Sequence, residues 1–110
     1  VLFRSRYWEE FLAKHKENKL KRAAALAGVA SCLENQGDNA AAAAKFDEAH
    51  LEFPFGPLNA YYVESAMRNF LLAGDIDSAR QQLDELKELV PDTDLYRRAA
   101  RSFAEKAYAG

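Results

Sequence analysis

The chain has 110 residues and a formal net charge of −2; 49% of the residues are hydrophobic and 29% are charged. This composition predicts one globular domain with an apolar core and excludes a disordered tail. Five glycines and three prolines are too few for the turns of an all-β sandwich, and no apolar run approaches the roughly 18 residues that a membrane-inserted segment needs.

Residues 1–5 look foreign to the domain. Their sequence, Val-Leu-Phe-Arg-Ser, resembles the translated end of a sequencing adapter, so we expect the native domain to cover residues 6–110. We also expect this chain to be a fragment of a longer protein. The lack of a signal peptide is then uninformative, because the segment that would carry one can lie upstream.

The first part of the chain is basic. Residues 1–22 contain seven Lys or Arg against three Glu. A basic end can meet phosphate groups, but these cations come singly or in pairs, without an aromatic platform or a nucleic-acid-binding motif around them. We therefore interpret them as a solvated helix face and expect no nucleic-acid partner.

Helical periodicity predicts six helices along the chain. Apolar residues recur at steps of three and four, and each such run stops at a glycine that can close a helix. The aspartate that follows can cap the next helix, whereas Pro54 and Pro91 lack the N–H needed to continue one. The predicted helices cover roughly residues 6–16, 20–35, 39–53, 57–73, 76–90 and 94–108.

Three stretches of the chain repeat with a period of 37 or 38 residues. In each copy a large apolar residue precedes a leucine by 12 positions. The three pairs are Trp8 and Leu20, Phe46 and Leu58, and Leu83 and Leu95. The dipeptide Gly37-Asp38 recurs as Gly74-Asp75 with the same period. A period of this length is typical of a solenoid built from supersecondary units.

The pattern around these turns resembles the tetratricopeptide repeat. The first copy supplies Leu26, Val29, Ala30, Leu33, Gly37, Ala42, Phe46, Ala49 and Pro54. The second supplies Val63, Ala66, Met67, Phe70, Gly74, Ala79, Leu83, Leu86 and Pro91. Met67 and Leu86 replace small residues of the family pattern, and the period is longer than the usual 34 or so. The resemblance implies an all-α, right-handed α-solenoid of about three helix–turn–helix units with six helices.

A narrower resemblance concerns the segments YWEEFLAKHKENKL and ALAGVASCLENQGD. They look like bacterial envelope tetratricopeptide proteins, including ancillary translocon subunits and cell-division coordinators. That likeness implies a periplasmic or envelope-anchored adaptor whose repeats hold partner proteins. The residues themselves do not distinguish it from a cytoplasmic adaptor.

No set of residues has the pattern of an active site or a metal site. We interpret Cys32 as a small apolar thiol and not as a nucleophile, because no group is placed to orient His50 as its base. His15 and His50 lack a third ligand at metal spacing and are expected at the surface or between repeats. Acidic pairs recur at one slot of the repeat, which predicts a solvated helix edge. These pairs are Glu9 with Glu10, Asp47 with Glu48, and Asp84 with Glu85. We therefore expect no catalytic residue, no metal and no cofactor. We also expect that the protein is not an enzyme.

The leading hypothesis is a non-catalytic scaffold that binds a peptide or helix of a partner protein in its concave groove. The family register puts small residues in the first unit of the groove, namely Ala24, Ala27 and Ser31. It puts Tyr61, Glu64 and Arg68 in the second and Arg98 and Arg101 in the third. An Arg pair can grip carboxylates and Tyr61 can add apolar area, so we expect an acidic or amphipathic segment. Ala27 and Ser31 stand where chaperone-tail-binding members carry Lys and Asn, so a chaperone tail is not expected.

Two alternatives stay open. One is a self-assembly module that stacks through its end helices, with an aromatic stripe containing Trp8 and Phe11 as the contact. The other is a helical accessory domain of a larger enzyme. In every case we expect Phe53 and Phe55 to fill the junction between units, Tyr62 to pack inward, and the following residues to be buried: Leu26, Val29, Leu33, Phe46, Val63, Phe70, Leu83 and Leu86.

Overall fold

The computed structural model describes residues 2–14 and 18–109, and every regular element within them is an α-helix. The six helices are α1 (Leu2–Lys14), α2 (Lys19–Asn35), α3 (Asn39–Glu52), α4 (Asn59–Leu72), α5 (Ile76–Leu89) and α6 (Asp94–Ala107). The predicted all-α class and number of helices are confirmed. Helix α1 begins four residues earlier than expected, and α2 to α6 agree with the predicted bounds within two residues.

Two helical hairpins are closed by the predicted glycines. Gly37 and Gly74 have φ values of 83° and 85°, a conformation that costs other residues energy because of their Cβ. The N–H of Asp38 donates to the Leu33 carbonyl at 3.0 Å, and the N–H of Asp75 donates to the Phe70 carbonyl at 2.9 Å. These six-residue closures are Schellman motifs, which satisfy the last carbonyls of α2 and α4.

The same aspartates begin the next helices. The Asp38 carboxylate accepts from the N–H of Ala41 at 3.3 Å, and the Asp75 carboxylate accepts from the N–H of Ser78 at 3.1 Å. Each Gly-Asp pair therefore ends one helix and caps the next, which reverses the chain in few residues.

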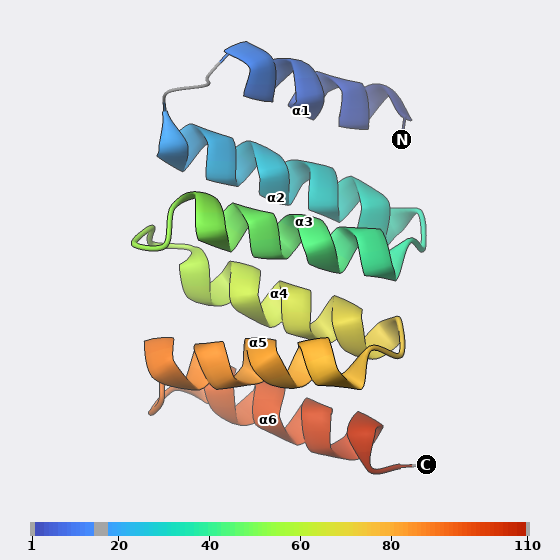
Figure 1. The fold of residues 1–110 in the computed structure, drawn as a ribbon, viewed down its shortest axis with the longest axis vertical. Helices are drawn as coiled ribbons and strands as arrows, with labels where there is room; N and C mark the ends of the chain where they lie inside the picture. The colour runs from blue at the N-terminus through green and yellow to red at the C-terminus, as the bar shows by residue number, and fades with distance from the viewer. Residues whose placement is uncertain (1, 15–17, 110) are drawn as a thin grey trace.

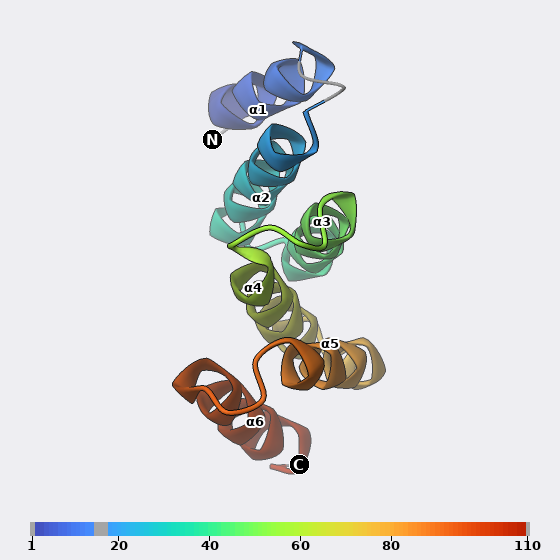
Figure 2. The ribbon, with the colours of Figure 1, turned by 90° about the vertical axis from the view of Figure 1, so that its left-hand side faces the viewer.

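The helices form two layers (Figures 1 and 2). Helices α2, α4 and α6 lie in one layer, α3 and α5 lie in the other, and α1 packs beside α2. Each of α2 to α5 packs mainly on its neighbours in the chain. This arrangement of helical hairpins is consistent with a solenoid, whereas its right-handed sense stays a prediction.

The core consists of two apolar clusters that share α4. The first contains Ala23, Leu26, Ala30, Phe46, Ala49, Tyr62 and Ala66. The second contains Val63, Met67, Leu71, Ala79, Leu86, Ala99 and Phe103. Phe70 packs against both clusters. Met67 and Leu86, which depart from the family pattern, are both fully buried in the second cluster.

Five of the eight residues expected in the core are buried, and three are only partly buried. Phe70 packs against both clusters, Leu83 packs against the second, and Leu33 lies near the end of α2 and belongs to neither cluster. Phe53 packs against the first cluster as expected, but Phe55 is 91% exposed and fills no junction. A turn carries Phe55: the N–H of Gly56 donates to the Phe53 carbonyl, and the N–H of Asn59 donates to the Gly56 carbonyl. Because of this turn, α4 begins two residues later than predicted.

The amino-terminal helix is joined to α2 and to the first cluster, against which Leu12 packs. The Arg22 guanidinium donates to the Leu12 carbonyl at 2.9 Å and to the Glu52 carboxylate at 2.8 Å, which joins α1, α2 and α3. The Trp8 ring lies against Gly28. Across the part of the chain that the structure describes, no helix has the length and hydropathy of a membrane crossing.

Candidate functional site

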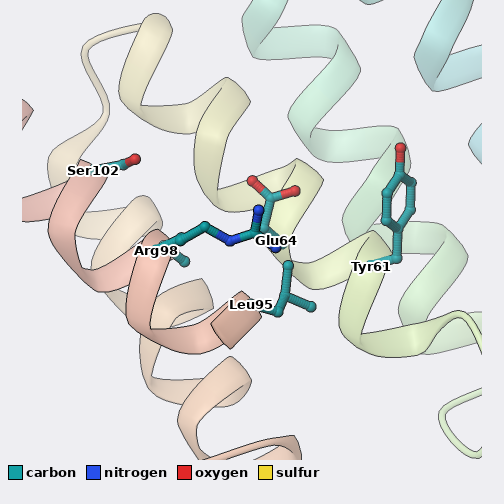
Figure 3. Close-up of a pocket in the computed structure, with 6 residues that line it drawn as sticks. Tyr61, Glu64, Leu95, Arg98 and Ser102 are labelled. Carbon is teal, nitrogen blue, oxygen red and sulfur yellow. The ribbon is translucent and has the colours of Figure 1, made fainter. Parts of the chain in front are cut away.

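A pocket of about 290 Å³ lies between α4 and α6, in the layer formed by α2, α4 and α6. Residues of α4 and α6 spaced by three and four positions form its two walls, because such residues share one helix face. The lining residues are Tyr61, Glu64, Leu95, Arg98, Ala99 and Ser102. Figure 3 shows Tyr61 and Glu64 on α4 across from Leu95, Arg98 and Ser102 on α6.

Tyr61 and Tyr62 have opposite environments, as predicted. The two residues are adjacent in α4, so their side chains point about 100° apart around the helix. Tyr61 is 56% exposed at the pocket, whereas Tyr62 is 6% exposed in the first cluster. Burial raises the pKa of the Tyr62 hydroxyl. Tyr61 therefore presents an aromatic ring to whatever enters the pocket.

Arg98 is exposed and keeps most of its donors free. Its Nε approaches the Asp94 carbonyl at 3.4 Å, a weak hydrogen bond. Its side chain extends from α6 toward Glu64 (Figure 3), but no ion pair with any described carboxylate forms. The guanidinium is thus available for a carboxylate from outside.

Arg68 is engaged within the chain instead. Its guanidinium is ion-paired to Glu34 of α2, and its Nε lies 3.5 Å from the Glu64 carboxylate. Burial lowers the pKa of Arg68, but the hydrogen bond and charge of Glu34, together with Glu64, raise it by more. Arg68 therefore joins α2 to α4 and holds Glu64 in place, outside the pocket lining.

Arg101 lies away from the pocket. It is two positions from both Ala99 and Phe103, which are the buried residues of α6, so its side chain leaves the helix on nearly the opposite face. The structure thus brings together Tyr61, Glu64 and Arg98 but not Arg68 or Arg101. Ala24, Ala27 and Ser31 on α2 also lie outside this lining.

Three lining residues were not expected from the sequence: Leu95, Ala99 and Ser102. The sequence could have indicated one of them, because Leu95 follows Leu20 and Leu58 as the third leucine of the repeat. Ser102 and Ala99 follow Arg98 and Leu95 by four positions each, which is the spacing of one helix face.

Charge is divided between the two layers. Helix α2 has three cations and one carboxylate, and α6 has four cations and two carboxylates, so each carries +2, while α4 is neutral. Helix α3 has one cation and three carboxylates, and α5 has two and four, so each carries −2. The layer that contains the pocket is therefore basic, and the other is acidic.

The polar groups between α3 and α5 form inter-repeat contacts. His50, 5% exposed, has its Nε2 3.3 Å from the Glu85 carboxylate, and Gln82 donates to Asp47 at 3.0 Å. Cys32 is a buried free thiol in α2, and His15 lies outside the described residues. Among the residues that the structure describes, no cluster of three or more His, Cys, Asp or Glu could hold a metal ion.

Comparison with known proteins gives no relative from which a role could be transferred. No family model, no curated protein and no solved structure matches this chain. The resemblance to tetratricopeptide repeats therefore stays an expectation that rests on the repeated residues of the sequence.

Proposed function

We propose that this chain is a non-catalytic tetratricopeptide-like scaffold that holds an acidic or amphipathic segment of a partner protein between α4 and α6. The observation that carries the proposal is the pairing of an exposed aromatic residue, Tyr61, with an unpaired cation, Arg98, across the apolar side chains of Leu95 and Ala99. Aromatic and arginine residues of this kind often dominate the free energy of protein interfaces.

Each wall of the pocket supplies a different interaction. The Tyr61 ring offers apolar area with a polar tip, and Arg98 can bind a carboxylate through two parallel hydrogen bonds. The Ser102 hydroxyl can donate or accept one more hydrogen bond. The Glu64 carboxylate faces the same space, but Arg68 offsets its charge, which limits its repulsion of an acidic ligand.

End-to-end stacking, one of the two alternative functions, gains no attraction from charge. Helix α6 carries +2, and α1 has three cations and two carboxylates, or two of each without Arg4 of the residues expected to be foreign, so neither end offers a negative surface. The aromatic stripe on α1 is also partly used within the chain, because Trp8 packs on Gly28. Self-association through Trp8 and Phe11 stays a prediction, as does the envelope location implied by the narrower resemblance.

Peptide display against the parent protein tests the proposal. Selected peptides are expected to combine carboxylates with apolar residues, and their binding is then measured by fluorescence anisotropy against three variants. Arg98→Glu should weaken binding by about tenfold or more, since a charge-assisted hydrogen bond contributes about 1.5–3 kcal/mol. Tyr61→Ala should weaken it by a similar factor, because the truncation of an aromatic anchor is among the costliest changes at an interface.

Arg101→Glu is the matched control, because it makes the same charge change on the same helix outside the pocket. It should weaken binding only slightly, and salt should reduce that small effect further. If Arg101→Glu and Arg98→Glu weaken binding equally in folded proteins, the attraction is a general effect of the basic layer and the pocket assignment is wrong.

A further inference from the structure

The two walls of the pocket between α4 and α6 differ in their chemistry. The α4 wall contains an aromatic ring and a carboxylate, Tyr61 and Glu64, and the α6 wall contains a guanidinium and a hydroxyl, Arg98 and Ser102. Within each wall the two residues are three or four positions apart, so they share one face of their helix (Figure 3). A ring and a carboxylate both attract a cation, whereas a guanidinium and a hydroxyl both donate to a carboxylate. The pocket therefore offers a place for a cation opposite the place for an anion.

Arg68 does not cancel the charge of Glu64. Its guanidinium is hydrogen-bonded to Glu34, whereas its Nε lies 3.5 Å from the Glu64 carboxylate, which is long for a hydrogen bond. Two carboxylates share this one guanidinium, so the group of Glu34, Arg68 and Glu64 keeps a net negative charge. The Glu64 side chain is 20% exposed and is the member of this group that lines the pocket. A ligand in the pocket thus meets a carboxylate whose charge is only partly compensated.

Glu64 and Arg98 are the two charged residues among those that line this pocket. The other charged residues of α6 lie outside the lining: Asp94, Arg97, Arg101, Glu105 and Lys106. Asp94 and Arg97 pair with each other at 2.6 Å. Arg101 leaves α6 on nearly the opposite face, and Glu105 and Lys106 lie about two turns beyond Arg98, beside a separate hollow. The charges that a ligand meets directly are therefore one negative and one positive.

These two charges do not satisfy each other across the pocket. No ion pair joins Glu64 to Arg98 in the part of the chain that the structure describes. A segment that carries only carboxylates would pair with Arg98 but would bring a like charge against Glu64, and such a placement lowers affinity. A segment that also carries a cation would pair with both walls. The pocket therefore discriminates between the two kinds of segment.

We propose that the segment held in this pocket carries a Lys or Arg close to its carboxylate, and that Glu64 is the residue that selects for this cation. The inference rests on the proposed function, since it concerns the ligand of the same pocket. The ligand's carboxylate binds Arg98 and Ser102 on α6, and its cation binds Glu64 and the Tyr61 ring on α4. In a helical ligand the two charged residues are three or four positions apart, because residues at that spacing are neighbours on the helix surface.

The peptides selected by display against the parent protein give the first test. We expect them to contain a basic residue three or four positions from a carboxylate more often than the starting library does. One such peptide is then synthesised in two forms, as selected and with its basic residue replaced by Gln. Fluorescence anisotropy should show that the Gln form binds the parent protein about tenfold more weakly, the loss typical of a charge-assisted hydrogen bond.

Glu64→Gln identifies the group that recognises the cation. This variant removes the charge of the side chain but keeps its size. It should weaken binding of the selected peptide by about tenfold and leave binding of the Gln form unchanged or tighter, because no cation is then lost and a like charge is removed. Glu105→Gln is the matched control, since it makes the same change on a carboxylate outside the pocket. It should leave the affinities for both peptides close to those of the parent.

The possible failures separate this inference from the proposed function. Selected peptides that lack a basic residue near the carboxylate, but still lose affinity in Arg98→Glu, overturn the inference and leave the proposed function in place. If Glu64→Gln weakens both peptide forms equally, or no more than Glu105→Gln does, Glu64 does not recognise the cation and the inference is wrong. Peptides that bind equally well to the parent, Tyr61→Ala and Arg98→Glu refute the proposed function, and the inference with it.

Discussion

The Trp8 indole lies so close to Gly28 that no larger residue fits between them. A Cβ built at Gly28 would lie 2.7 Å from the indole Nε1 and closer still to two ring carbons. The ring also contacts Tyr7 and Phe11, with centroids 5.2 and 6.1 Å apart. A glycine inside a helix ordinarily weakens it, but this glycine lets α1 approach α2.

Gly28→Ala should therefore destabilise the protein, although Gly→Ala in a helix usually stabilises it by about 0.5–1 kcal/mol. We expect a loss of about 1–3 kcal/mol, which is typical of overpacking, and a red shift of the fluorescence of the single tryptophan. Urea unfolding gives the free energy of unfolding. In the Trp8→Ala background the same substitution should be neutral or stabilising, whereas a gain in the parent would contradict the contact.

Phe46→Ala should cost about 3–5 kcal/mol, because it removes a large side chain from the first cluster. Phe55→Ala is the matched control, since it makes the same change at an exposed position; we expect it to stay within about 0.5 kcal/mol of the parent. Thermal and urea unfolding compare the two. Equal melting of Phe46→Ala and the parent would mean that the repeat register is wrong.

Gly74→Ala tests the hairpin turn without any steric contact. Apart from its two chain neighbours, no residue has an atom within 4 Å of a Cβ built at Gly74, so the effect comes from the positive φ of 85°. We expect a loss of about 1–2 kcal/mol. Gly74→Asn should cost less, since Asn tolerates this conformation better. If Asn proves worse than Ala in urea unfolding, the turn does not have the geometry described.

The cap of α5 should make stability depend on pH in the acidic range. Hydrogen bonds from the Ser78 side chain and backbone N–H lower the pKa of Asp75 below its ordinary value. A group with a lowered folded-state pKa stabilises the protein fully above its unfolded pKa of about 3.9 and loses this effect as the pH falls through the folded value. Asp75→Asn should therefore reduce the loss of stability below about pH 4, measured by urea unfolding at a series of pH values. Asp92→Asn is the control, and an equal effect there would exclude the cap as the cause.

The helices could be predicted from the sequence because their limits are set locally. Gly37-Asp38 and Gly74-Asp75 contain the residues that end one helix and cap the next, and the structure uses both pairs in this way. The opposite environments of Tyr61 and Tyr62 could also be predicted from the sequence. Adjacent residues of a helix lie on different faces, so both environments are decided once the buried face of the helix is known.

The groove residues were harder to predict because partners distant in the sequence decide them. Arg68 was expected in the groove, but Glu34, 34 residues earlier, engages its guanidinium. Arg98 and Arg101 were expected to act together, but α6 packs through Ala99 and Phe103, which turns only Arg98 toward α4. The exposure of Phe55 depends on a turn between two helices. The periodic pattern of apolar residues does not indicate the hydrogen bonds of such a turn.

Helix α4 contributes opposite faces to the two apolar clusters, and this has a consequence for how the chain opens. Tyr62 and Ala66 belong to the first cluster, while Val63 and Met67 belong to the second. Neither half can unfold without uncovering one face of α4, so the interior of this helix opens only when the whole chain does. Backbone amides should then exchange with deuterium most slowly in α4 and progressively faster toward α1 and α6, which have a neighbour on one side only. The units of a repeat array are coupled through the interfaces that they share; here the shared element is a whole helix, so the loss of either half weakens the other.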